Sequence, residues 1–138
     1  MNTQEEFYAQ VRGFIDQRGK TFLKDAMDRM NWQGWEHDFD SKNETTGEDN
    51  SPTFMSVVRK SNYKHGHRIQ FSMCADVDEV LFCAINHLNP SVSFRVYLEL
   101  DRITETDVEK FVWEAFHSLK DITKKAEFIR HTTDSPAI

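Results

Sequence analysis

Apolar residues recur every three or four positions near both ends of the chain, the period of an amphipathic helix. The stripes near the N-terminus are Phe7, Val11, Phe14 and Ile15, then Phe22, Leu23, Ala26, Met27 and Met30. Gly19 lies between them, and Gly commonly ends helices, so the pattern fits two helices or one helix bent at Gly19. A third stripe, from Val108 to Leu119, predicts a last helix that begins near Thr104 or near Thr106. Thr106 has Glu109 three positions later, the spacing of a capping box.

In the middle of the chain, apolar and polar residues alternate, which is the period of a half-buried strand. The predicted strands span residues 35–40, 54–60, 69–75, 80–86 and 92–100. The run Val80–Asn86 also fits a helical stripe, but its β-branched and aromatic residues, and the Asn89-Pro90 turn after it, favour a strand. Asp40–Pro52 reads as a loop and Ser61–His67 as the turn of a hairpin.

This order of elements predicts an α+β fold, an antiparallel four- to five-stranded meander with N-terminal helices and a C-terminal helix packed on one face. We expect residues 1–130 to form a single domain and residues 131–138 a flexible tail. The second face of the sheet would carry Tyr97 and part of Met55–Val58. That apolar content suggests a cover, either a partner chain or the second N-terminal helix.

Composition narrows the class of protein further. The 138 residues are 38% hydrophobic, enough for a packed core, and the net charge of −6 argues against general coating of nucleic acid. No apolar run approaches the ~18 residues of a membrane span, and the N-terminus lacks the pattern of a signal peptide. We therefore expect a soluble, cytoplasmic protein without a membrane partner, in which Cys74 and Cys83 are reduced.

The local scaffolds of common enzyme chemistries are missing from the sequence. The five glycines are not spaced as a phosphate-binding loop, and there is neither a nucleophilic serine elbow nor a pair of cysteines two residues apart. We expect a non-catalytic protein with no cofactor and no bound metal. An active site assembled from distant residues would leave no such signature.

Three weaker candidate sites have a simpler structural interpretation. His65 and His67 point the same way in an extended segment and could meet one metal ion, or both are solvated at a hairpin tip. Cys83 and His87 would lie one turn apart in a helix, but a cysteine in an apolar run usually behaves as a small hydrophobe. The carboxylates of the first strand could form a cluster, or simply its wet face; they are Glu36, Asp38 and Asp40.

One segment of the chain is positive. The stretch from residue 50 to residue 75 holds four of the 17 Lys and Arg residues and none of the 23 Asp and Glu residues. We call its centre, Arg59–Arg68, the basic hairpin tip. Its candidate binding residues are Arg59, Lys60, Tyr63, Lys64, His65, His67 and Arg68.

Three interpretations of the basic hairpin tip remain open. Its cations could be a solvated guard of a strand edge. They could contact a protein, including the acidic stretch Glu36–Asp49 of a second copy or of the same molecule. They could also contact nucleic acid, with Tyr63 stacking on a base.

The sequence therefore predicts a small binding protein that engages another protein, of the chaperone, adaptor or inhibitor type, as a homodimer. The alternative is a nucleic-acid-binding protein that uses the basic hairpin tip, residues 59–68.

Overall fold

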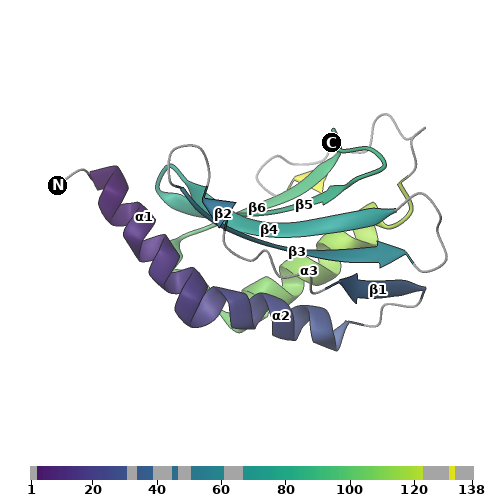
Figure 1. Ribbon diagram of the computed structural model, residues 1–138, viewed down its shortest axis with the longest axis horizontal. Coiled ribbons are helices and arrows are strands. Elements are labelled where there is room, and N and C mark those ends of the chain that lie inside the picture. The colour runs from purple at the N-terminus through teal and green to yellow at the C-terminus, as the bar shows by residue number, and fades with distance from the viewer. Residues whose placement is uncertain are drawn as a thin grey trace.

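A computed structural model describes residues 3–30, 34–38, 45–46, 51–60, 67–122 and 131–132. In this part of the chain an antiparallel sheet is packed on one face by an N-terminal helical run and a C-terminal helix, which confirms the α+β prediction (Figure 1). None of the described helices combines the length and the apolar character needed to cross a membrane.

The N-terminal helical run is continuous and does not end at Gly19. It consists of α1 (Thr3–Phe14), a π-helical turn η1 (Ile15–Gly19) and α2 (Lys20–Arg29), and it bends along its length (Figure 1). A Cβ atom at Gly19 would lie 2.8 Å from Sδ of Met73 in the sheet and 3.0 Å from the Phe14 ring. Glycine is therefore needed here for close packing of the helix on the sheet, and not as a helix stop.

The described residues form a seven-stranded sheet in the order β1-β3-β4-β5-β6-β7, with β2 also pairing with β3. The strands are β1 (Trp35–Asp38), β2 (Thr45–Thr46), β3 (Pro52–Lys60), β4 (Arg68–Asp76), β5 (Glu79–Asn86), β6 (Ser93–Leu98) and β7 (His131–Thr132). All pairs are antiparallel except β6 with β7.

Most of the predicted strands are present, with different ends. The run Val80–Asn86 is a strand, as its composition favoured. The last predicted strand stops earlier, because Leu100–Arg102 forms a 3₁₀ turn, η2. Two-residue strands occur within the predicted loop and at the start of the predicted tail. The predicted end of the first strand, Phe39 and Asp40, lies outside the described residues.

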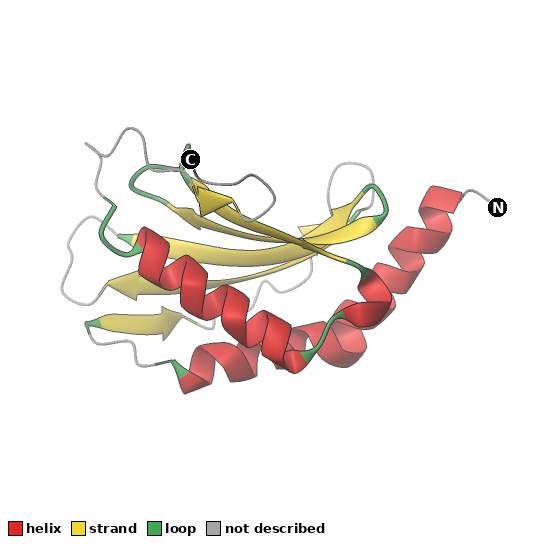
Figure 2. Ribbon diagram, turned by 180° about the vertical axis from the view of Figure 1, so that it is seen from behind, coloured by secondary structure: helices red, strands yellow, loops and turns green. Residues whose placement is uncertain are grey.

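Alternate residues of the sheet point toward the helices and are buried. The inner face includes Phe54, Val58, Ile69, Phe71, Met73, Val80, Phe82, Ala84 and Phe94. The helix α3 (Glu105–Leu119) lies across this face (Figure 2). Its Phe111 ring has its centroid 6.1 Å from that of Phe71 and 5.5 Å from that of Phe82. Burial of each such phenylalanine stabilises the fold by roughly 1.5–3 kcal/mol.

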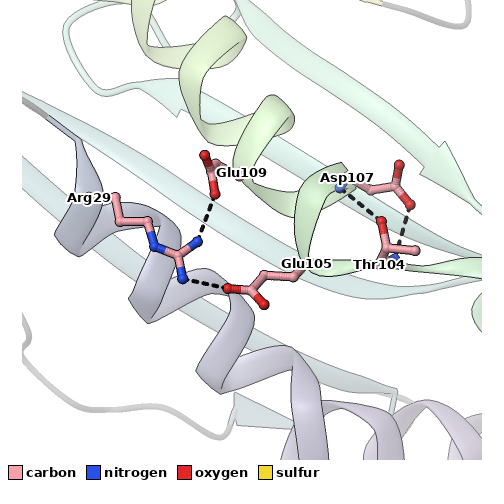
Figure 3. A network of polar contacts seen from close by, with 5 residues as sticks. All are labelled: Arg29, Thr104, Glu105, Asp107 and Glu109. Atoms are coloured by element: carbon pink, nitrogen blue, oxygen red, sulfur yellow. Dashed lines mark hydrogen bonds and ion pairs between the residues drawn. The ribbon is translucent and has the colours of Figure 1, made fainter.

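The start of α3 is fixed by a capping box and by a contact with α2 (Figure 3). The Thr104 hydroxyl accepts from the Asp107 backbone N–H at 3.2 Å, and the Asp107 carboxylate accepts from the Thr104 N–H at 3.0 Å. Helix initiation at Thr104 is confirmed, and the alternative at Thr106 is wrong. Glu109 pairs instead with Arg29 at 2.7 Å, and Glu105 binds the same guanidinium at 2.6 Å.

Candidate functional site

The sheet has a second face that points away from the helices, which we call the outer face. Its residues are Thr53, Met55, Val57, Arg59, Arg68, Gln70, Ser72, Cys74, Asp76, Glu79, Leu81, Cys83, Ile85, Ser93, Arg95 and Tyr97. None of them belongs to the core that the helices share with the inner face. The proposed cover by the second N-terminal helix is therefore wrong, because α2 packs beside α3 on the inner side.

The strand register gathers aliphatic side chains in the middle of the outer face. Val57 is opposite Gln70, which is opposite Ile85, so the three form one row across the sheet. Met55 begins the next row, and Leu81 stands in the row after that. These side chains are half-buried. An antiparallel sheet with one face in water normally presents polar residues on that face, and the aliphatic centre departs from this pattern.

A polar cluster on β5 and β6 adjoins this aliphatic centre. Arg95 is directly opposite Cys83, and hydrogen bonding to Tyr97 is the main cause that raises the pKa of Arg95. Burial raises the pKa of the Cys83 thiol, although Arg95 acts in the opposite direction. Burial also raises the pKa of Cys74 to about 11. Both thiols are therefore protonated near neutral pH and are weak nucleophiles.

The other predicted chemical pairs are not brought together by the described residues. Cys83 lies in a strand, so the helical spacing that would join it to His87 is absent. Glu36 binds Arg59, while the Asp38 side chain and Asp40 lie outside the described part of the chain. Within that part, no group of three or more His, Cys, Asp or Glu side chains is placed to hold a metal ion.

At one end of the outer face lies the base of the basic hairpin tip. Arg59 and Arg68 are directly opposite each other and exposed, and Lys60 is exposed beside them. An Arg59 Nη2 atom lies 3.3 Å from Oε2 of Glu36, so one acid of the acidic stretch meets the tip within the same molecule. The candidates Tyr63, Lys64 and His65 lie outside the described residues.

His67 does not share the exposed surface of the tip. Its side chain is only 3% exposed, and its ring packs edge-on against Trp35 with the centroids 4.8 Å apart. Its Nε2 atom lies 3.0 Å from Nδ2 of Asn86, which is fully buried. The expectation that His67 is solvated is therefore wrong. Neither Asn86 nor the burial of His67 was predicted, although each continues the alternation of buried residues along its strand.

The opposite end of the outer face is acidic. Asp76 and Glu79 are opposite each other there on adjacent strands. They lie next to an open groove of about 470 Å³ between α1 and the β4–β5 turn. The groove is lined by Phe7, Gln10, Asp78, Glu79, Glu99, Leu100 and Asp101. Because β4 runs the length of the sheet, Arg68 and Asp76 are about 25–30 Å apart at roughly 3.3 Å per residue. The outer face is thus positive at one end and negative at the other.

Comparisons of the chain with protein-family models, with curated proteins and with solved structures found no match.

Proposed function

We propose that the chain is a non-catalytic binding protein that engages another protein, of the chaperone, adaptor or inhibitor type, and that it acts as a homodimer joined through the outer face. The observation that carries this proposal is the aliphatic centre of a sheet face on which none of the described helices packs. Two such faces packed together would remove Met55, Val57, Leu81 and Ile85 from water, which is favourable.

The charges of the outer face favour a second copy as the occupant. A two-fold axis joins identical surfaces, so each surface must be complementary to itself. With the strands of the two copies running in opposite directions, Arg59 and Arg68 of one copy would face Asp76 and Glu79 of the other. A parallel arrangement would place like charges together, and like charges disfavour association.

The part of the basic hairpin tip between Arg59 and Arg68 is the part that we assign to the client protein. Lys60 is exposed beyond the row of Arg59 and Arg68, and the predicted contacts Tyr63, Lys64 and His65 follow it in sequence. A cluster of cations is complementary to an acidic surface and speeds the encounter with it. We therefore propose an acidic protein surface as the client.

Light scattering coupled to size exclusion at micromolar concentration tests the assembly. We expect a dimer for the wild type and a monomer for Ile85→Lys, which places a charge in the aliphatic centre. Trp113→Lys is the matched control, because Trp113 is 54% exposed on α3, away from the outer face. A monomeric wild type, a dimer that survives Ile85→Lys, or a dimer that Trp113→Lys disrupts equally would rule out this interface.

Nucleic-acid binding is a second candidate, favoured by one observation. Arg59 and Arg68 are exposed and face each other across the hairpin, and the Glu36 carboxylate, 3.3 Å from Arg59, balances one of these two charges, so the base of the hairpin keeps a positive charge suited to phosphate. Lys64→Ala and Arg68→Ala should then weaken binding, and each should lower its salt slope by about one if its cation binds a phosphate. Arg102→Ala, at the acidic end, is the control. If labelled DNA and RNA show no shift at low salt, this candidate is removed.

A further inference from the structure

His67 and Asn86 form a buried polar pair at one corner of the inner face. Asn86, the last residue of β5, is 0% exposed and His67, just before β4, is 3% exposed. Three parts of the chain meet at this pair. The His67 carbonyl accepts from the Lys60 N–H at 2.8 Å across the hairpin, the His67 ring packs on Trp35 of β1, and Asn86 binds the end of α3.

Two backbone groups of opposite polarity fix the orientation of the Asn86 amide. Its Oδ1 accepts from the Leu88 N–H at 2.9 Å, and its Nδ2 donates to the Leu119 carbonyl at 2.7 Å. Turning the amide over would place Oδ1 against the Leu119 carbonyl and leave the Leu88 N–H facing a donor. Two acceptors compete for the second hydrogen of Nδ2, Nε2 of His67 at 3.0 Å and the Ile122 carbonyl at 3.4 Å, and the shorter contact assigns it to His67. Nε2 of His67 must be the acceptor, so the ring is neutral and carries its proton on Nδ1.

We propose that His67 and Asn86 are a proton-sensitive latch that is closed at neutral pH and opened by acid, releasing the end of α3 and the base of the basic hairpin tip. One proton passes from solvent to Nε2, and the neutral imidazole becomes an imidazolium. No other covalent bond forms or breaks. The new N–H then faces the N–H of Asn86, donor against donor. The pair must separate, because turning the amide would break its bonds to Leu88 and Leu119.

The surroundings of the ring set the pH at which this happens. Burial is the main cause that lowers the pKa of His67, and the Lys60 ammonium on β3 lowers it further. The hydrogen bond that Asn86 donates to the neutral ring favours the neutral form as well. Among the described residues, the other groups at this site on β1, β5 and α3 are neutral. They are the Trp35 ring, the Asn86 amide and the Leu119 carbonyl. The folded pKa lies below the value of about 6.5 in the unfolded chain, so the closed form is fully favoured above that pH and is lost as the pH falls below it.

The backbone amide of Leu88 reports directly on the latch, because its acceptor is the Asn86 side chain. Hydrogen exchange followed by NMR, divided by the intrinsic rate at each pH, gives its protection. For uptake of one proton we expect this protection to fall up to about tenfold per pH unit below pH 6.5, until the folded pKa is reached. The amide of Val108, bonded at the start of α3, should show no such change.

His67→Gln is the decisive variant, since the Gln Oε1 atom is an acceptor that does not titrate; it should abolish the pH dependence at Leu88. His87→Gln is the control, because its pKa is also lowered by burial and by Arg68, yet it lies outside the pair. Equal protection of Leu88 at both pH extremes, or an unchanged fall in His67→Gln, would overturn the latch. A nitrogen-15 spectrum of the wild type that places the neutral-pH proton on Nε2 of His67 would overturn it without any variant. The latch lies on the inner face, so its test is independent of the proposed dimer.

Discussion

At the scale of single residues, Asn86 and Val77 are among the described positions that depart from the ordinary chemistry of their elements. Asn86 is a polar side chain in the core, and Val77 is a β-branched residue with a positive φ of 55°. The hydrogen bonds of Asn86 explain its place. The strain at Val77 has no such compensation, because its side chain is 75% exposed.

Asn86→Ala should lower the free energy of unfolding by about 2–4 kcal/mol, because the Leu88 N–H and the Leu119 carbonyl lose their buried partner. Urea denaturation at neutral pH measures this. Asn89→Ala, in the following turn, is the control and should cost less than about 1 kcal/mol. Equal losses for the two variants would show that the buried hydrogen bonds of Asn86 contribute little.

Val77→Asn should raise the free energy of unfolding by about 1 kcal/mol, since Asn tolerates a positive φ that β-branched residues avoid. Thermal unfolding compares it with Val77→Ile, which keeps the β-branch and should match the wild type. A destabilised Val77→Asn would show that the valine side chain has a role in the turn beyond conformation.

At the basic hairpin tip, the chemical type of a residue did not predict whether its side chain is buried. His67 stands in a charged run, which suggested exposure, yet it shares the odd-numbered positions of Ile69, Phe71 and Met73 on the inner face. Asn86 likewise follows Val80, Phe82 and Ala84 on the even-numbered positions of β5. The alternation of inner-face positions along each strand therefore indicates the burial of both residues. The partners of both residues could not be predicted, because Leu119 and Trp35 are distant in sequence.

At the scale of elements, the two glycines of the N-terminal helical run have opposite roles. A Cβ atom at Gly13 would meet nothing within 4 Å, whereas one at Gly19 would collide with Met73 and Phe14. Gly13→Ala should therefore stabilise the fold by about 0.5–1 kcal/mol through helix propensity. Gly19→Ala should destabilise it by about 1–3 kcal/mol through overpacking. Denaturant midpoints measure both; a stabilised Gly19→Ala would contradict the close packing of η1 on β4.

The first turn of α3 offers a second matched pair. Thr104→Ala removes the hydroxyl of the capping box and should cost about 1 kcal/mol. Thr106→Ala should be neutral or slightly stabilising, because Thr106 is exposed within the helix and alanine has the higher helix propensity. Thermal unfolding of the two variants decides between the two helix starts that the sequence allowed. A larger loss for Thr106→Ala would contradict the observed cap.

The elements themselves could be predicted from periodicity, and their ends could not. Most of the longer strands follow from alternation and the last helix from the apolar stripe, whereas the strand at Val80–Asn86 follows from its composition and the turn after it. The π-helical turn η1 has no signature in the local sequence, and Gly19 at its end lies close to Met73, a residue far along the chain. The two-residue strands depend on pairing partners, β3 for β2 and β6 for β7, rather than on any local pattern.

At the scale of the whole molecule, the fold divides the sheet into a buried inner face and an outer face with a charge at each end. The sequence predicted that the second face would be partly apolar, and left open what covers it. Only the arrangement of α2 beside α3 removes the helix as a candidate. The other candidate, a partner chain, stays a prediction, and we propose that it is a second copy oriented by the positive and negative ends of the outer face.

A charge-exchange experiment tests this central proposal most directly, by sedimentation velocity at low ionic strength. One variant reverses the two cations at the positive end of the outer face, Arg59→Glu with Arg68→Glu, and the other reverses the two acids at the negative end, Asp76→Lys with Glu79→Lys. Circular dichroism first checks that both variants are folded.

In the proposed antiparallel dimer, each variant alone places like charges opposite one another and should be monomeric. An equimolar mixture restores opposite charges at both ends and should sediment as a dimer, like the wild type. A mixture that remains monomeric while the wild type is a dimer would contradict the proposed pairing, and a monomeric wild type would contradict the dimer itself.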